Sequence, residues 1–458
     1  MNITAIRPQK IDVIGSGIAG LSCAWLLNKA HRVTLYEKDD RLGGHSNTVS
    51  FDLNGTQVDV DTGFIVFNPD NYPNLVKFFD YINLPTCETD MSFAVSVDNG
   101  GLEYSGSGLG GLFAQKRNLI NPAFWSMIKD LMRFYQNADD MMADASLAEV
   151  SLGELLNRHG YGDRFIYDHL LPMGAAIWST PVQQMLEYPA LSFLRFCQNH
   201  GLLQVSDRPQ WHTIPGGSIG YVSKIAASLE GRVRTNSRIH KVIRRPDGVI
   251  IQDLHGAHEH YDEVVLACHA DQALALLENP TEQEKQLLSS FPYQRNRALL
   301  HLDESLLPRN KKVWSSWNYM ASGSARDERQ VSVSYWMNRL QPLATEQPVI
   351  VSLNPLKEPA PDKLIRSFFY DHPAFGQDSL INQQKLWSLQ GQQNTWFCGA
   401  WFGYGFHEDG IQSGLAVAEQ LGGIPRPWFL DNPNSRIFVT TKTPEITAQN
   451  EIRERVHG

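Results

Sequence analysis

The apolar residues at the start of the chain follow two different periods. Residues 11–14 and 32–37 are short, mostly apolar runs, as expected of buried strands. Between them a glycine-rich turn leads into a segment in which Leu21, Ala24 and Leu27 recur at helical spacing. The pattern predicts a strand over 11–14, a tight turn, a helix and a second strand over 32–37, which together form a βαβ unit.

Later segments change period several times. "VSFDLNGTQVDVDTG" predicts a hairpin turning at Asn54-Gly55, and residues 73–204 are helical and aromatic, with a long amphipathic segment over 121–142. Short alternating strands follow, with turns near Asp247-Gly248 and His255-Gly256. A second mixed, aromatic stretch precedes a last strand in "TWFCGAW" and a last helix in "GIQSGLAVAEQLGG".

These changes predict two interleaved domains instead of two domains in series. Residues 1–72, 205–290 and 385–424 are expected to build a Rossmann-like α/β domain with a parallel sheet. Residues 73–204 and 291–384 are expected to form an α+β substrate domain that caps the first. The tail over 425–458 reads as irregular, with mobile last residues.

Composition narrows the function classes. The 458 residues are 42% apolar and 19% charged, which fits a globular chain, and the net charge of −9 argues against a nucleic-acid partner. Five scattered cysteines without a CxxC pair suit a reducing compartment and give no zinc site. The first ten residues hold no signal sequence, and no apolar run is long enough for a transmembrane helix. We therefore expect a cytoplasmic protein.

The turn after the first strand is a GxGxxG motif, Gly15–Gly20, placed between a strand and a helix as dinucleotide binding requires. Gly15 allows the tight turn, Gly17 lets a pyrophosphate approach the backbone, and Gly20 lets helix and strand pack closely. Glu37, at the end of the second strand, can accept hydrogen bonds from a ribose diol. An ordinary glycine turn with a surface glutamate is the alternative.

The next loop favours FAD over NAD. "EKDDRLGGH" adds a second glycine turn that can lie along the longer FAD molecule, and Arg41 can neutralise a phosphate, unless it is a solvated surface charge. The strand that ends at Asp61 could bring the chain to an isoalloxazine ring. The residues expected at the cofactor are Gly15, Ser16, Gly17, Ile18, Ala19, Gly20, Glu37, Lys38, Arg41, Gly43, Gly44, His45, Thr62, Gly63, Phe64 and Ile65.

At this point the chain resembles a known family. "DVIGSGIAG", "YEKDDRLGGH" and "VDVDTGFIVFN" are similar to the amine-oxidase-like flavoproteins, a group that includes monoamine oxidases, protoporphyrinogen oxidase and phytoene desaturase. "MSFAVS", "GLFAQKRNLINPAFWSMI", "AAIWSTP", "HGLLQVSDRPQWHTIPGGS" and "FCGAWFGYGFHEDG" resemble one subgroup. It contains bacterial predicted FAD-binding proteins and the N-terminal oxidase-like domain of plant cyclopropane fatty acid synthases. The resemblance covers residues 10–422 and implies an adenine contact at Val242 and a last flavin contact at Gly399, Asp409, Gly410 and Ile411.

His407, Glu408 and Asp409 stand in a row in "FGYGFHEDG". Adjacent residues cannot share one helix face, and the chain has no HExxH, so we expect no metal site. Asp409 is predicted to cap a helix that starts near Gly410. The resemblance implies that this helix end faces the flavin. His407 is either a catalytic residue or a structural histidine.

The sequence indicates the substrate less clearly than it indicates the cofactor. Tyr370 and His372 in "FFYDHPAF" could act as base or orienting group, and no lysine matches the flavin-facing lysine of many amine oxidases. The resemblance to the plant fusion implies a fatty acyl or other lipid substrate and a desaturase or oxidase reaction. A small-amine oxidase is the second reading, and a non-catalytic flavin-binding partner of a lipid methyltransferase is the third.

Contact with the inner face of a membrane stays open as well. Lys116, Arg117, Lys129 and Arg133 lie in or near the amphipathic segment 121–142, which could lie at an interface with its apolar side down. The alternative is that this apolar stripe packs on the protein core.

Overall fold

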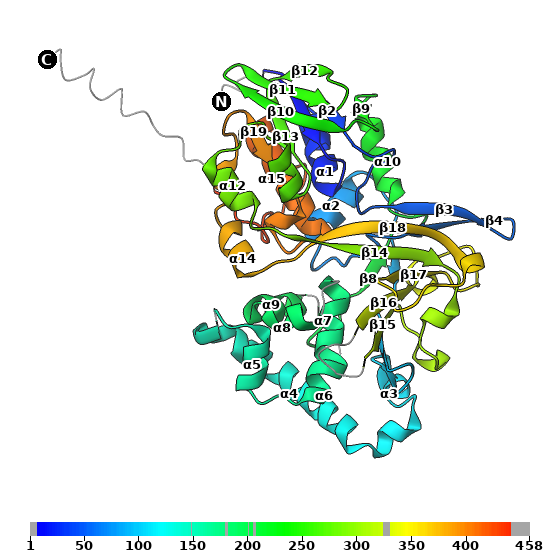
Figure 1. Cartoon of the computed structure of the whole chain (residues 1–458). Helices are drawn as coiled ribbons and strands as arrows, with labels where there is room; N and C mark the ends of the chain where they lie inside the picture. Colours follow the sequence, from blue (N-terminus) through cyan, green and yellow to red (C-terminus); the bar gives the residue numbers. More distant parts are fainter. Residues whose placement is uncertain are drawn as a thin grey trace, which may run out of the picture.

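The structure is a computed structural model that describes residues 7–147, 149–178, 182–199, 201–204, 208–323 and 330–440. The domain boundary expected at residue 205 and the end of the expected tail, 441–458, lie outside these residues. The described part divides into two bodies, one around a parallel sheet and one around a larger mixed sheet (Figure 1).

The first body is built on a five-stranded sheet in which all neighbouring strands are parallel. Its strands come from the beginning, the middle and the end of the chain. In spatial order they are β19 (Thr395–Phe397), β13 (Glu263–Leu266), β1 (Lys10–Ile14), β2 (Arg32–Tyr36) and β9 (Val233–Arg234). The predicted βαβ unit is confirmed, because α1 (Ile18–Leu27) joins β1 to β2.

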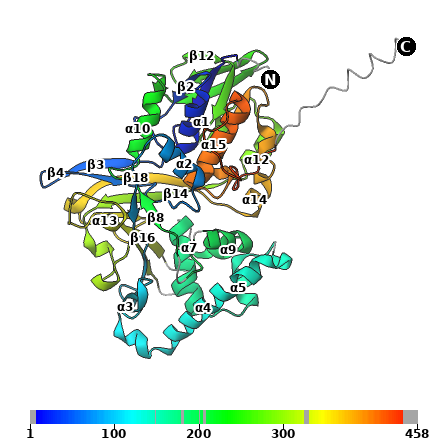
Figure 2. The same ribbon diagram turned by 180° about the vertical axis from the view of Figure 1, so that it is seen from behind.

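Helices and a small sheet cover the parallel sheet on its two faces. The last helix, α15 (His407–Gly422), packs along α1, and both are labelled side by side in Figures 1 and 2. A three-stranded antiparallel sheet formed by β10 (Ile239–Arg245), β11 (Gly248–Asp253) and β12 (His258–Tyr261) contacts β1 and β13. Its turns fall where the sequence predicts them. Further helices of this body are α2 (Pro73–Tyr81), α10 (Ile219–Ser228), α11 (Ala270–Leu276), α12 (Glu282–Leu288) and α14 (Gln377–Gln383).

The second body is built on a seven-stranded mixed sheet. Its order is β18 (Leu364–Pro373), β14 (Tyr293–His301), β17 (Ile350–Leu353), β16 (Gln330–Trp336), β15 (Trp317–Ser322), β6 (Phe93–Val97) and β7 (Leu102–Ser105). The long pair β14–β18 runs along the junction with the first body (Figure 1). The short helix α13 (Met337–Leu340) follows β16.

A helical block packs beside this sheet, away from the parallel sheet (Figure 2). It contains α4 (Pro122–Ala143), α5 (Leu152–Arg158), α6 (Asp163–Phe165), α7 (Leu171–Trp178), α8 (Val182–Glu187) and α9 (Ala190–Asn199), whereas the short helix α3 (Gly108–Leu112) contacts β7. The predicted amphipathic segment is α4, and its apolar stripe is buried at Phe124, Met127, Phe134, Ala138 and Met141. The apolar stripe of α4 packs on the protein core, as the second alternative predicted. It does not lie against a membrane surface, as the first alternative predicted.

The predicted hairpin is β3 (Thr48–Leu53) and β4 (Thr56–Asp61), with Asn54 and Gly55 at positive φ in its turn. A further small pair, β5 (Cys87–Thr89) and β8 (Trp211–Thr213), completes the sheets of the described residues. None of the helices that the structure describes is both long and apolar enough to cross a membrane.

The described part of the tail, residues 425–440, has neither helix nor strand but packs closely on the first body. The Trp428 ring stacks on Trp25 at 6.1 Å, and Arg426 Nη1 donates to Asn74 Oδ1 (2.8 Å). The guanidinium of Arg436 lies buried beside the start of α15. The tail thus adds three large side chains to the surface of α1, α2 and α15.

Candidate cofactor and active site

The carboxyl ends of four parallel strands meet at one edge of the five-stranded sheet. Gly15 follows β1, Glu37 follows β2, His269 lies shortly after β13 and Gly399 shortly after β19. The helices α1 and α15 also begin here, since a Cβ placed on Gly410 would lie 2.7 Å from Ile18 Cγ2. Two helix N-termini with free N–H groups and positive dipole ends therefore converge at the edge where α/β folds bind their ligands.

The first glycine turn has a different constraint at each glycine. Gly15 has φ of +109°, and a Cβ on Gly20 would lie 1.9 Å from the Gly15 carbonyl oxygen, so helix and strand touch. A Cβ on Gly17 would meet no protein atom within 4 Å. The open space at Gly17, directly before the first turn of α1, is the approach that a pyrophosphate needs.

Glu37 braces this turn. It is buried, and its Oε2 accepts hydrogen bonds from the Ser16 N–H (3.1 Å) and Ser16 Oγ (2.5 Å), while Oε1 accepts from the Asp39 N–H (3.0 Å). A carboxylate has about four lone-pair sites, so one remains for a ribose hydroxyl.

The second glycine turn packs against the first. The Gly43 N–H donates to the Ser16 carbonyl (3.0 Å), and a Cβ on Gly44 would lie 3.1 Å from Gly17 Cα. Arg41 Nη1 donates to the Gly44 carbonyl (2.8 Å), so this guanidinium holds the loop, whereas Lys38 is exposed. The phosphate contact expected of Arg41 stays a prediction for its remaining donors.

The segment after β4 lies on the second glycine loop. The Phe64 N–H donates to the His45 carbonyl (2.7 Å), and a Cβ on Gly63 would lie 2.2 Å from the same oxygen. The Ile65 carbonyl accepts from Thr213 Oγ1 (2.8 Å). Residues 62–65 are therefore held between the glycine turns and the junction with the second body.

Tyr370 ties this segment to β18. Thr62 Oγ1 donates to the Asn47 carbonyl (3.0 Å), which leaves the Tyr370 hydroxyl to donate to Thr62 Oγ1 (2.7 Å) while it accepts from Asn47 Nδ2 (2.8 Å). Both hydrogen-bonding roles of the phenol are used within the protein. A role as orienting group therefore stays a prediction for Tyr370, and burial raises its pKa.

A chain of amides fixes the protonation of His372. The Arg297 N–H donates to Asn354 Oδ1, Asn354 Nδ2 donates to Asn296 Oδ1, and Asn296 Nδ2 donates to His372 Nδ1 (2.9 Å). The neutral ring must then carry its proton on Nε2. Burial, with a smaller effect of His269, lowers the pKa of His372 to about 4. His372 is therefore a neutral hydrogen-bond donor, and a role as base at Nε2 does not fit this tautomer.

His45 lies between these groups. Its ring centroid is 5.1 Å from that of Tyr370 and 5.2 Å from that of His372, and its buried Nε2 has no hydrogen-bond partner in the protein. Burial and the neighbouring histidines hold its pKa well below the ordinary value. A buried, neutral and unsatisfied ring nitrogen points to a ligand at this position.

The three residues of "HED" have three separate roles. The His407 ring stacks on Phe64 at 3.6 Å, its Nε2 lies 2.9 Å from Ser46 Oγ, and burial lowers its pKa to about 3. Glu408 accepts from the N–H groups of Asn74 and Leu75 at the start of α2 (3.1 Å each). The prediction that Asp409 is the N-cap was wrong: α15 starts at His407, and Asp409 Oδ2 reaches back to the Phe406 N–H (2.7 Å).

Two other residues predicted to contact the cofactor, Gly399 and Val242, form backbone hydrogen bonds to other parts of the protein. The Gly399 N–H donates to Ser413 Oγ (3.0 Å), which fastens the loop after the last strand to the first turns of α15, where Ile411 also lies. The Val242 carbonyl in β10 accepts from the Glu278 N–H (3.1 Å), so the adenine contact at Val242 stays a prediction. Among the described residues, no three His, Cys, Asp or Glu side chains are grouped to hold a metal ion.

The comparisons with known proteins agree with this geometry. Residues 18–341, more than half of the chain, match the family model described as flavin containing amine oxidoreductase. The chain belongs to this family of FAD-dependent oxidoreductases. The open space at Gly17 fits the pyrophosphate of the flavin dinucleotide, and FAD is its cofactor.

Individual relatives of this flavoprotein are distant. It is 24% identical over 301 residues to the carotenoid 3,4-desaturase of Haloarcula japonica, covering 61% of this chain and 59% of that protein. Each curated relative is matched over less than two thirds of its own length. A putrescine oxidase variant (TM-score 0.66, 14% identity, 90% of this chain and 98% of that one) shares the fold. So does the fatty acid isomerase of P. acnes (TM-score 0.62, 15%, 89% and 97%).

Several residues around the flavoprotein site were not predicted. Ser46 and Tyr221 contact His407, Asn296 fixes His372, and the His269 ring stacks on Tyr293 at 4.2 Å. His269 could have been found, because it lies shortly after a parallel strand at the binding edge. The others are joined to the site only by the fold.

A Glu37→Ala variant should bind FAD about 10- to 100-fold more weakly, since it would lose the predicted ribose bond and the brace on Ser16, at about 1–3 kcal/mol. FAD affinity measured by fluorescence titration tests this. Asp39→Ala, in the same loop, is the matched control and should leave affinity unchanged. Equal affinities for wild type and Glu37→Ala would contradict the assignment.

Proposed function

We propose that this flavoprotein is a desaturase or oxidase of an apolar acyl or other lipid substrate, such as a methylated or cyclopropane fatty acyl chain. The observation that carries the proposal is the long alignment with a carotenoid 3,4-desaturase, since the L-amino-acid oxidase match covers only 12% of this chain. The fold shared with a fatty acid isomerase and the resemblance to the plant cyclopropane fatty acid synthases support the same substrate class.

The side chains at the junction of the two bodies suit an uncharged substrate. His45, His372 and His407 are partly buried and neutral, and Tyr370 is bonded within the protein. An apolar chain enters such a surface without desolvating a charge.

The roles of these residues follow from their hydrogen bonds. Bound FAD supplies the oxidation by accepting a hydride. We propose that His45, through its unpaired Nε2, takes up the proton that leaves the neighbouring carbon. His372 donates from Nε2 to orient the ligand, Tyr370 is a positioning residue, and His407 is held by Ser46 beside the start of α15.

The pH dependence tests the neutral histidines. Because burial lowers the pKa of His372 to about 4 and that of His407 to about 3, both stay neutral from about pH 5 upward. The rate of flavin reduction should therefore show no step near pH 6.5, where free histidine titrates. Stopped-flow reduction between pH 5.5 and 8 measures this. A step near 6.5 that His372→Gln abolishes would contradict the assignment.

The deciding experiment is anaerobic bleaching of the flavin band near ~450 nm. Phospholipids with unsaturated, cyclopropane or methyl-branched chains are compared with a panel of amines. Bleaching by a lipid supports the proposal. Bleaching by amines alone favours the amine-oxidase reading. Bleaching by neither, in protein that dithionite reduces, favours a non-catalytic flavin-binding partner of a lipid methyltransferase.

A further inference from the structure

The segment from Tyr104 to Lys129 combines two features that are unusual for this chain. It contains three basic residues, Lys116, Arg117 and Lys129, and no aspartate or glutamate, although the whole protein carries a net charge of −9. Among the residues that the structure describes, no carboxylate pairs with any of the three. This segment is therefore a local positive surface on an acidic protein.

The same segment exposes large apolar side chains. Ile120 is 85% exposed and Leu109 76%, while Leu119 and Trp125 are about half exposed. The Trp125 indole N–H donates to the Leu119 carbonyl (2.9 Å), and its ring lies 5.4 Å from that of Phe113. These four side chains and the basic residues form what we call the tip surface.

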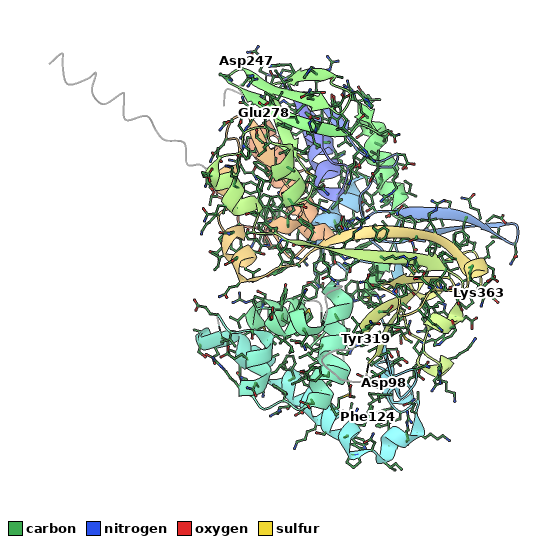
Figure 3. The ribbon with its side chains drawn as sticks, viewed as in Figure 1. Asp98, Phe124, Asp247, Glu278, Tyr319 and Lys363 are labelled. Atoms are coloured by element: carbon green, nitrogen blue, oxygen red, sulfur yellow. The ribbon has the colours of Figure 1, made fainter. Side chains whose placement is uncertain are left out.

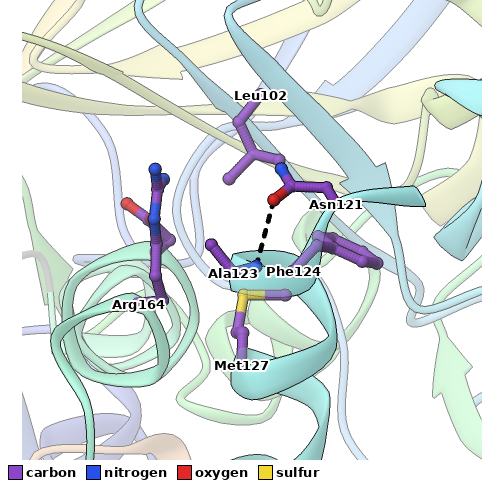
Figure 4. Close-up of a pocket in the computed structure, with 7 residues that line it drawn as sticks. Leu102, Asn121, Ala123, Phe124, Met127 and Arg164 are labelled. Atoms are coloured by element: carbon purple, nitrogen blue, oxygen red, sulfur yellow. Dashed lines mark hydrogen bonds and ion pairs between the residues drawn. The ribbon is translucent and has the colours of Figure 1, made fainter. Parts of the chain in front are cut away.

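Local geometry makes the tip surface protrude. Residues 116–120 form a single 3-10 turn, and α4 then starts abruptly, because Asn121 Oδ1 accepts the Ala123 N–H (3.0 Å) and Pro122 occupies the first helical position. Figure 4 shows this cap beside a small pocket whose lining includes Phe124 and Met127 of α4 and, on the opposite side, Arg164. The first turn of α4 is thus anchored, and Leu119 and Ile120 stand outside it.

The tip surface lies at one end of the molecule. Figures 1 and 2 place α3 and the start of α4 at the end opposite the parallel sheet, and Figure 3 shows Phe124 at that end and Asp247 at the other. The basic residue Arg133, farther along α4, is neutralised by Asp130 (2.9 Å). The exposed charge and apolar area are therefore concentrated before the helix and not along it.

We propose that the tip surface docks the enzyme on an anionic lipid bilayer. Isolated, highly exposed Leu and Ile side chains on a convex tip suit insertion between lipid headgroups, and a half-exposed tryptophan suits the interface. Unopposed basic residues next to them are attracted by anionic headgroups. The inference rests on the proposed function, since a bilayer is the source from which an apolar lipid substrate would come.

The test is co-sedimentation of the FAD-loaded full chain with vesicles, which needs no turnover. Wild type should bind phosphatidylcholine vesicles containing 30 mol% phosphatidylglycerol and lose most binding at 0.5 M salt. Leu119→Asp with Ile120→Asp should weaken binding at least about tenfold, and so should Lys116→Gln with Lys129→Gln. The control Leu254→Asp changes an exposed leucine (57%) on the distant β11–β12 turn and should bind as wild type does.

Failure to sediment, or equal binding by the tip variants and the Leu254→Asp control, would overturn the proposal. A mass measured by light scattering that falls from dimer to monomer in the tip variants, with vesicle binding unchanged, would assign the surface to a second copy instead. Vesicle binding together with flavin bleaching by amines alone would reject the lipid substrate and retain the docking surface. Flavin bleaching by lipids without vesicle binding would retain the lipid substrate and reject the docking surface.

Discussion

A Gly17→Ala variant is expected to fold with the stability of the wild type and to lose FAD. Gly17 has φ of −66° and ψ of 176°, which alanine adopts freely, and no protein atom lies within 4 Å of the added Cβ. The new methyl group instead fills the space through which the pyrophosphate approaches the backbone. We expect FAD affinity to fall at least about 100-fold, or about 3 kcal/mol, while the free energy of unfolding of the FAD-free protein stays within about 0.5 kcal/mol.

Gly20→Ala is the matched comparison. Its Cβ would lie 1.9 Å from the Gly15 carbonyl oxygen, a backbone atom that cannot turn away. This variant should lose both FAD and at least about 2 kcal/mol of stability. Urea unfolding of the FAD-free proteins and titration with FAD separate the two effects. If Gly17→Ala bound FAD like the wild type, the cofactor would have to lie elsewhere.

An Arg436→Gln variant is expected to lose about 3 kcal/mol of unfolding free energy. Arg436 Nη1 lies 3.7 Å from Asp409 Oδ1, and both side chains are almost fully buried. Removal of one partner leaves a buried carboxylate without its compensating charge. Lys285→Gln, which breaks an exposed pair with Glu282, is the control and should cost less than about 0.5 kcal/mol.

The pH dependence of this loss identifies its cause. Burial raises the pKa of Asp409, and the charge of Arg436 partly opposes that rise. Without Arg436 the folded-state pKa rises further, so the folded protein prefers protonated Asp409 and loses stability as pH rises above the carboxyl's ordinary range. The deficit of the variant should be larger at pH 8 than at pH 5. An equal deficit at both would assign the loss to the bond from Arg436 Nη2 to the Asn71 carbonyl.

Elements of the fold could be predicted from the sequence where the hydrophobic pattern and the turn residues of one short segment indicate the same structure. The βαβ unit and its glycine turn were predictable because strand, turn and helix follow each other within thirty residues, and Asn54-Gly55 specified its hairpin directly. The start of α15 was misplaced for a local reason. An aspartate near a helix start is favourable both as the N-cap and in the first turn, and only the hydrogen bond to Phe406 distinguishes these positions.

The parts that sequence could not supply depend on long-range contacts. The tautomer of His372 is set by Asn296, which is 76 residues away in the sequence. Asn296 is in turn oriented by Asn354, which is 58 residues from Asn296. Arg436 reaches Asp409 from a tail with no regular structure. Neither relation has a signature in spacing or composition. The sequence also could not predict which apolar side chains are exposed, because tertiary packing decides this. The apolar stripe of α4 is buried, whereas Leu119 and Ile120 in the preceding turn are exposed.

The order of strands in the five-stranded sheet has a consequence for biosynthesis. β13 can pair with β1 as soon as the middle of the chain has been synthesised, but its other edge stays open until β19 arrives near residue 395. During translation a growing chain must therefore carry an unpaired parallel edge and an incomplete cofactor cradle through more than a hundred further residues. Such an edge is a hazard for association between nascent chains. FAD can therefore be captured in full only after β19 has been synthesised and has joined the sheet.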